Sequence, residues 1–154
     1  MKKGYTIIEL LVMVGILTVL ASFIVPTYQL ILAQFQLTSA AAQVAEFLIL
    51  TEQKTVTEQK IYGVTLTANA STIPQFLYNP VPNPPTKTTQ TTFTLPSNII
   101  ISSVNFSSNS DVRFTASGAP SVSGNVVIKD TIRNRSRRIE VRPSGAILAN
   151  TAEF

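Results

Sequence analysis

The fold of this chain is decided near its start, where residues 4–25 read Gly-Tyr-Thr-Ile-Ile-Glu-Leu-Leu-Val-Met-Val-Gly-Ile-Leu-Thr-Val-Leu-Ala-Ser-Phe-Ile-Val. Glu9 is the only charged residue between Tyr5 and Val25. As an α-helix, residues 5–25 would extend over about 31 Å, enough for the hydrocarbon core of a bilayer. An Asp-like charge at the centre of such a helix costs roughly 2.5–3.5 kcal/mol on insertion. We therefore expect Glu9 to have a functional partner.

From the residues alone, two simpler interpretations of this segment stay open. A cleavable signal peptide would use Leu20-Ala21-Ser22 as an imperfect cleavage site, although Glu9 and Pro26 argue against it. An ordinary signal anchor explains the hydropathy, and the two lysines that precede the segment favour a cytoplasmic N-terminus. It explains neither Gly4 nor Glu9.

Residues 4–12 resemble the class III leader of type IV pilins and pseudopilins. In that family a short basic leader ends in Gly, and an aromatic residue, Thr, two apolar residues, Glu and two Leu follow. The departure here is Tyr5, where Phe is usual. The resemblance implies that a prepilin peptidase removes the leader, residues 1–4, by cutting between Gly4 and Tyr5. It also implies that the new amine of Tyr5 is N-methylated.

The resemblance gives Glu9 a role in assembly that physical chemistry supports. After cleavage Tyr5 carries a charged amine at neutral pH, one helical turn before Glu9. In parallel, axially staggered helices the amine of one subunit can reach Glu9 of the next, which neutralises both charges in an apolar setting. Pro26 lacks an N–H and clashes with the carbonyl of Ser22, so we expect it to kink the helix or to end its membrane part.

The helical pattern continues beyond this segment to residue 57. Residues of one stripe recur at spacings of three and four: Leu37, Ala41, Val44, Leu48, Thr51 and Thr55. We expect one long helix over residues 5–57. Its first half, residues 5–25, would lie in the membrane or the filament core, and its second half would pack on a β domain.

After Lys60 the pattern changes to alternation, which is typical of strands. Strands are expected at 61–67, 75–78, 91–95, 98–106, 112–115, 125–129, 137–142 and 146–149, and turns at 117–120, 123–125 and 143–145. The proline-rich segment 79–86 is expected to be a loop with polyproline II character. The expected fold is therefore α+β, with a long N-terminal helix and an antiparallel β-sheet or sandwich domain over residues 60–154.

The region 39–66 and the order of motifs at 112–114, 126–129, 138–141 and 144–147 are similar to the GspH/FimT group of minor pseudopilins and minor pilins. The resemblance implies a structural subunit of a type IV pilus or of a type II secretion pseudopilus, and does not separate the two. Its partners would be other pilin subunits, the prepilin peptidase and membrane lipid. It would cross the bacterial inner membrane once, with its N-terminus cytoplasmic and its β domain outside, before it joins the filament.

The composition argues against an enzyme. The chain has no Cys and no His, which excludes thiol and imidazole catalysis and most zinc sites. It contains no Gly-x-Ser-x-Gly, no Ser-x-x-Lys and no glycine-rich phosphate loop. We expect no catalytic residues, no cofactor and no metal.

Basic residues gather near the C-terminus. The Arg cluster comprises Lys129, Arg133, Arg135, Arg137, Arg138 and Arg142, opposed only by Asp130 and Glu140. Arg133, Arg135 and Arg137 share alternation parity, so in a hairpin they could line one face. Arginine suits bidentate contacts with phosphate, and a DNA-binding minor pilin for DNA uptake is therefore the alternative function. The cluster could equally be a solvated hairpin tip, or a charged contact with another subunit or with anionic headgroups.

Overall fold

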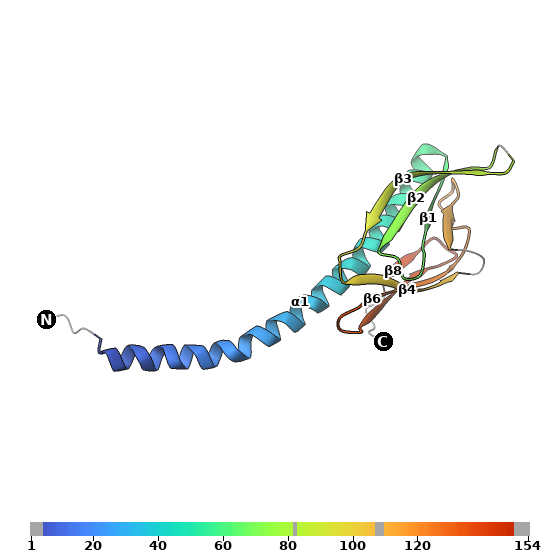
Figure 1. Cartoon of the computed structure of the whole chain (residues 1–154). Helices are drawn as coiled ribbons and strands as arrows, with labels where there is room; N and C mark the ends of the chain where they lie inside the picture. Colours follow the sequence, from blue (N-terminus) through green and yellow to red (C-terminus); the bar gives the residue numbers. More distant parts are fainter. Residues whose placement is uncertain (1–4, 82, 107–109, 150–154) are drawn as a thin grey trace. The chain divides into compact units, whose positions relative to one another are not determined.

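The computed structural model describes residues 5–81, 83–106 and 110–149, without the side chains of residues 23–27, 29 and 30. Within these residues it holds the α-helix α1 (Ile7–Glu58) and the strands β1 (Ile61–Thr65), β2 (Thr72–Asn79), β3 (Thr86–Thr94), β4 (Ile99–Phe106), β5 (Asp111–Phe114), β6 (Gly124–Asp130), β7 (Ser136–Val141) and β8 (Ile147–Ala149). The expected α+β class with a long N-terminal helix is confirmed (Figure 1). The chain divides into two compact units, Met1–Phe35 and Gln36–Phe154, so that the boundary falls inside α1.

The first unit contains the start of α1. The helix begins after Thr6, whose hydroxyl oxygen accepts a hydrogen bond from the backbone N–H of Glu9 at 3.3 Å. The helix continues through Pro26, whose side chain lies outside the described part, so the kink stays a prediction. Among the helical residues that the structure describes, no stretch is both long enough and apolar enough to cross a membrane.

In the second unit the later half of α1 packs on the β-strands. Every residue of the expected stripe is buried there, namely Leu37, Ala41, Val44, Leu48, Thr51 and Thr55. Apolar residues of this stripe share one core cluster with Val64, Val112 and Phe114 and with Val126 and Ile139. The period of three and four therefore identified the face that the helix buries.

The strands form two antiparallel sheets, β3-β2-β1-β5 and β4-β6-β7-β8 (Figure 1). In the first sheet Tyr62 lies opposite Leu77 on one side and Phe114 on the other. In the second sheet Val126 lies opposite Val104 and Ile139. The inward-facing residues of both sheets contribute to the same core as α1. Because side chains alternate along a strand, this core also determines which residues face outward.

All the expected strands are present; most of their boundaries differ by one or two residues, and the starts of two strands differ by more. β2 begins at Thr72 and β3 at Thr86, three and five residues earlier than expected. Threonine favours strands, but the start of β3 was not expected because the polar run Thr86–Gln90 shows no apolar alternation. The described residues of the proline-rich segment join β2 to β3, as expected for a loop.

The turn expected at 123–125 is wrong, because Gly124 and Asn125 belong to β6 and pair with Val141 and Glu140. A Cβ at Gly124 would lie 2.1 Å from the carbonyl oxygen of Asn105 and 2.7 Å from the ring of Phe106. This glycine therefore permits close packing of strands and does not form a turn. The other two glycine turns are present, with positive φ at Gly118 and Gly145.

Candidate functional sites

The first half of α1 presents apolar side chains to its surroundings all around the helix. Within this unit Ile7 is 84% exposed, Val12 55% and Leu17 64%. A shallow hollow of about 340 Å³ is lined by Val12, Gly15, Ile16, Val19 and Leu20. Nothing lies within 4 Å of a Cβ placed at Gly15. Small residues let helices approach closely in apolar surroundings, so this surface can accept another helix.

Glu9 also lies in a local sequence pattern at the start of α1 that the interpretation of the leader did not include. It occupies the third position of α1, and its N–H is capped by the hydroxyl of Thr6. The pattern Thr6-x-x-Glu9 is that of a capping box, in which the Glu side chain can return to the N-cap N–H. This signal was visible in residues 6–9. Gly4 lies outside the described residues, and Tyr5 is 75% exposed, so cleavage and methylation stay predictions.

The turn between β6 and β7 carries the first part of the Arg cluster. Asp130 is buried, and its Oδ1 accepts hydrogen bonds from the N–H groups of Ile132 at 2.9 Å and Arg133 at 3.4 Å. Asn134 adopts a left-handed conformation with φ 59°. Arg133 and Arg135 therefore lie in an ordered turn and not on a strand.

Arg137 has a structural position. It is only 9% exposed and shares the inward face of β7 with Ile139 and Val141. Its Nη2 donates to the hydroxyl of Thr38 on α1 at 3.2 Å. The expectation that Arg133, Arg135 and Arg137 line one face is wrong, because the turn interrupts the alternation. The apolar residues Ile139 and Val141, at alternate positions after Arg137, indicate in the sequence that Arg137 faces the core.

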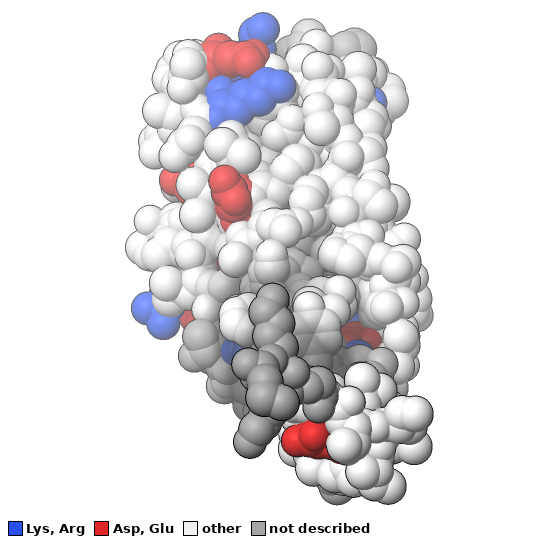
Figure 2. All heavy atoms as spheres, turned by 90° about the vertical axis from the view of Figure 1, so that its left-hand side faces the viewer, with Lys and Arg blue, Asp and Glu red and all other residues white. Residues whose placement is uncertain are grey.

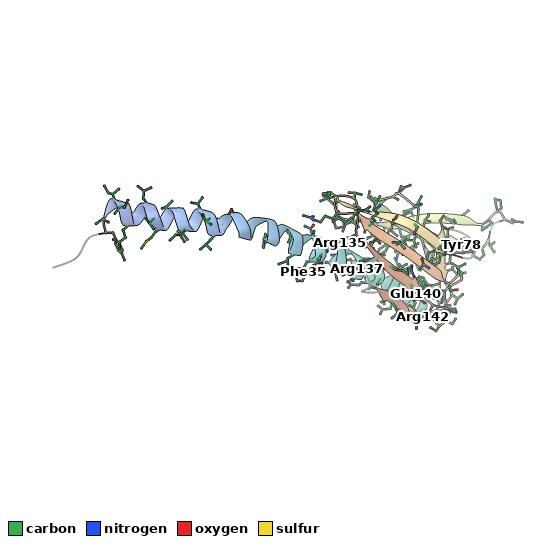
Figure 3. The ribbon with its side chains drawn as sticks, turned by 90° about the horizontal axis from the view of Figure 1, so that it is seen from below. Phe35, Tyr78, Arg135, Arg137, Glu140 and Arg142 are labelled. Atoms are coloured by element: carbon green, nitrogen blue, oxygen red, sulfur yellow. The ribbon has the colours of Figure 1, made fainter. Side chains whose placement is uncertain are left out.

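Of the remaining members, Arg138 lies on the other face of β7, Arg142 follows its end, and Lys129 belongs to β6. A polar hollow of about 400 Å³ is lined by Ser123, Gly124, Asn125, Arg138, Glu140, Val141, Arg142 and Pro143. Within it the Nε of Arg142 lies 3.2 Å from Oε1 of Glu140. In Figure 3 the labels of Arg135 and Arg137 stand at one end of the strand and those of Glu140 and Arg142 at the other.

The Arg cluster is therefore spread out. Along an extended strand the backbone distance from Arg137 to Arg142 is about 17 Å. Lys129 lies opposite Ser136, at the other end of β7 from Arg142. On the face shown in Figure 2 charged side chains are sparse, and the largest group, at the top, holds basic and acidic side chains side by side. The structure does not bring the basic residues together in one patch.

Two ionisable groups near the later half of α1 have shifted pKa values. The hydroxyl of Tyr62 donates to Oε2 of Glu58 at 2.5 Å, and this hydrogen bond, together with burial, raises the pKa of Tyr62. Burial raises the pKa of the Glu52 carboxyl above its ordinary value. Among residues 5–81, 83–106 and 110–149, no group of three acidic residues is arranged to hold a metal ion.

The fold was compared with solved structures. Two structures of the minor pseudopilin EpsH, from the type 2 secretion system of Vibrio cholerae, share it. The chain has a pseudopilin-like fold. One EpsH structure matches with a TM-score of 0.58 and 10% identity, over 75% of this chain and 96% of that chain. The other matches with a TM-score of 0.54 and 9% identity, over 76% and 94%. No protein-family description and no curated protein matches the sequence.

Proposed function

We propose that this protein is a structural minor subunit of a type II secretion pseudopilus or a type IV pilus. One observation carries the proposal: a domain with the EpsH fold is joined to a helix whose first half exposes apolar side chains on all sides. Apolar surface of this extent needs a cover of lipid or protein. Neighbouring helices of a filament supply such a cover, and before assembly the bacterial inner membrane does.

In this proposal a prepilin peptidase cuts between Gly4 and Tyr5, and the amine of Tyr5 is methylated. The direct test is mass spectrometry of the full chain produced together with a prepilin peptidase. The expected product has lost residues 1–4 and carries one methyl group on Tyr5. A mature protein that begins at Met1 or Ser22 would contradict the proposal.

The pairing of Glu9 with a neighbouring amine can be separated from its capping role. Glu9→Gln removes the charge but keeps a side chain that suits a capping box. Thr6→Val keeps the charge but removes the hydroxyl that accepts from the Glu9 N–H, at a cost of about 1 kcal/mol. We expect Glu9→Gln to lose incorporation into filaments and Thr6→Val to retain it. Equal incorporation of the two variants into filaments would contradict the pairing and leave Glu9 only its place in the helix cap.

DNA binding is the second candidate function. It is favoured by the polar hollow, which both Arg138 and Arg142 line on the outer side of the second sheet. Guanidinium groups suit phosphate oxygens, and the affinity of such a site for duplex DNA should fall steeply with salt. The test is a salt series with the full chain and with Arg138→Ala/Arg142→Ala. Arg137→Ala is a poor probe, because it breaks the contact with Thr38.

A further inference from the structure

Three of the four edge strands, β5, β4 and β8, are covered by a loop or are very short, which hinders pairing with another chain. On β5, the N–H of Arg113 donates to the hydroxyl of Ser121, and the N–H of Ser121 donates to the carbonyl of Arg113. On β4, the N–H of Ile101 donates to Ala70, and its carbonyl accepts from Asn69. β8 has only three residues. Cover by a loop and short length are the usual ways in which proteins prevent an edge from pairing with another chain.

β3 is the exception. It is an edge strand of nine residues, and all of them except Phe93 are exposed. Among the described residues, no backbone hydrogen bond of residues 86–94 extends beyond the ladder with β2. A register shift opposite Gln75 and Phe76 makes Gln90 a bulge, so that the edge consists of two arms, 86–89 and 91–94.

The charge on this edge is already neutralised within the sheet. Lys87 pairs with Asp111 on the outer face, and its Nζ lies 5.0 Å from the centre of the Phe76 ring. A lysine that pointed outward from the edge would oppose an incoming strand. β3 therefore presents a neutral row of β-branched residues, which pair well across strands.

The helix beside β3 indicates which strand would fit. The ring of Phe93 stacks on Phe47 of α1 with centroids 5.4 Å apart. Leu50 lies three residues after Phe47, hence on the same side of the helix, and it is 52% exposed. A strand added to β3 would place alternate side chains toward this flank of α1. Apolar side chains there would bury Leu50, while the opposite face would stay polar.

We propose that β3 is a docking edge for an extended segment of another polypeptide, with apolar residues on the α1 side and polar residues on the other. A second copy of β3 fits less well, because its residues on the α1 side include the hydroxyl-bearing Thr88 and Thr91. The inference stands on the edge of β3 and the flank of α1 beside it, and does not depend on the proposed function.

The probe is a fluorescent peptide of alternating Val and Thr, as long as β3, measured by anisotropy against the full chain in detergent micelles. Two control peptides carry backbone N-methyl groups, one on every Val and one on every Thr. Only alternate N–H groups of a paired strand face the edge. We expect one methylated peptide to lose at least about tenfold in affinity and the other to bind normally. Equal binding of both, or no binding of the parent peptide, would overturn the proposal.

Protein variants make the test independent of the peptide. Of the adjacent residues Thr91 and Thr92, one N–H pairs with β2 and the other points outward, so Thr91→Pro and Thr92→Pro should differ. We expect one variant to keep its circular dichroism spectrum and melting temperature but to lose at least about tenfold in peptide affinity. Val81→Pro, in the exposed loop, is the matched control and should bind normally.

Two results would contradict the proposal here. The first is a folded outward variant that binds the peptide as the native chain does. The second is self-association of the native chain that displaces the peptide and disappears in that same variant, because it would assign the edge to a second copy.

Discussion

The two halves of α1 are continuous in the backbone but opposite in what surrounds them. Between Ile7 and Leu20 apolar residues occur on every side and are exposed within their own unit. Between Leu37 and Thr55 most of them lie on one stripe, which both sheets bury, and Ile49 and Leu50 are the exposed exceptions. A helix that is apolar all round needs an external apolar environment, whereas an amphipathic helix finds its cover in its own chain. The spacing of apolar residues, more than their number, indicates whether the partner is internal.

The largest expected effect comes from truncating a leucine in each half. Leu48 is fully buried, and Leu48→Ala should lower the free energy of unfolding by about 2–5 kcal/mol. Leu10 is 60% exposed, and Leu10→Ala should change it by less than about 0.5 kcal/mol. Denaturant titration of the full chain in micelles measures both. Comparable losses would mean that the first half packs within its own chain.

The glycines give a second, smaller contrast. A Cβ at Gly63 would lie 2.8 Å from the Phe76 ring and 2.8 Å from the carbonyl oxygen of Val112. Gly63→Ala should therefore destabilise the protein by about 1–3 kcal/mol. Gly15→Ala meets nothing within 4 Å and should stabilise the helix by up to about 1 kcal/mol. The same titrations measure both free energies of unfolding. A Gly63→Ala variant as stable as the native chain would show that the Phe76 ring can move away from the added methyl group.

Threonines test hydrogen bonding in the two halves. The hydroxyls of Thr18 and Thr51 both donate to the carbonyl four residues before them, but Thr51 also accepts from Nε2 of Gln75 at 2.7 Å. Thr51→Val leaves this buried amide without its acceptor and should cost about 1–3 kcal/mol. Thr18→Val should be nearly neutral. If Thr51→Val is as mild, Gln75 must find another acceptor.

The smallest expected effect is a dependence on pH. The Oε1 of Glu52 lies 3.0 Å from the position of a Cβ at Gly118 and 3.5 Å from one at Gly145. Burial raises its pKa, so the fold favours the protonated carboxyl, and this stabilisation is lost as the pH rises through the folded-state pKa. Thermal unfolding from about pH 4 to about pH 7 should show that Glu52→Gln gains on the native chain as the pH rises. Parallel curves for the two proteins would contradict this.

Much of the fold was predictable because each element has its own period. The stripe from Leu37 to Thr55 gave the buried helix face, and alternation gave every strand. β3 was underestimated because Thr and Gln at 86–90 carry no apolar alternation, although the strand pairs with β2, its neighbour in the sequence. The turn signal at Gly124 was misleading, because a glycine that admits a neighbouring strand has the same local sequence as one that turns.

The candidate sites were less predictable than the fold. The Arg cluster is contiguous in sequence, but the turn at Asp130 and the buried side of β7 distribute its members over different surroundings. Arg137 could have been placed inward from the parity of Ile139 and Val141. The burial of Phe76 beneath Lys87 and the uncovered edge of β3 could not have been found, because both depend on which strands are neighbours.

The threonines inside α1 have a mechanical consequence. Thr51 is joined to Gln75 of β2, and Thr55 accepts from the backbone N–H of Tyr62 in β1 at 3.3 Å. Apolar contacts alone would let a helix slide or rotate over a sheet with little directional resistance, whereas these hydrogen bonds have donors and acceptors at fixed heights. A tension applied along the helix would be transmitted into β1 and β2, and one turn of slippage would break both bonds together.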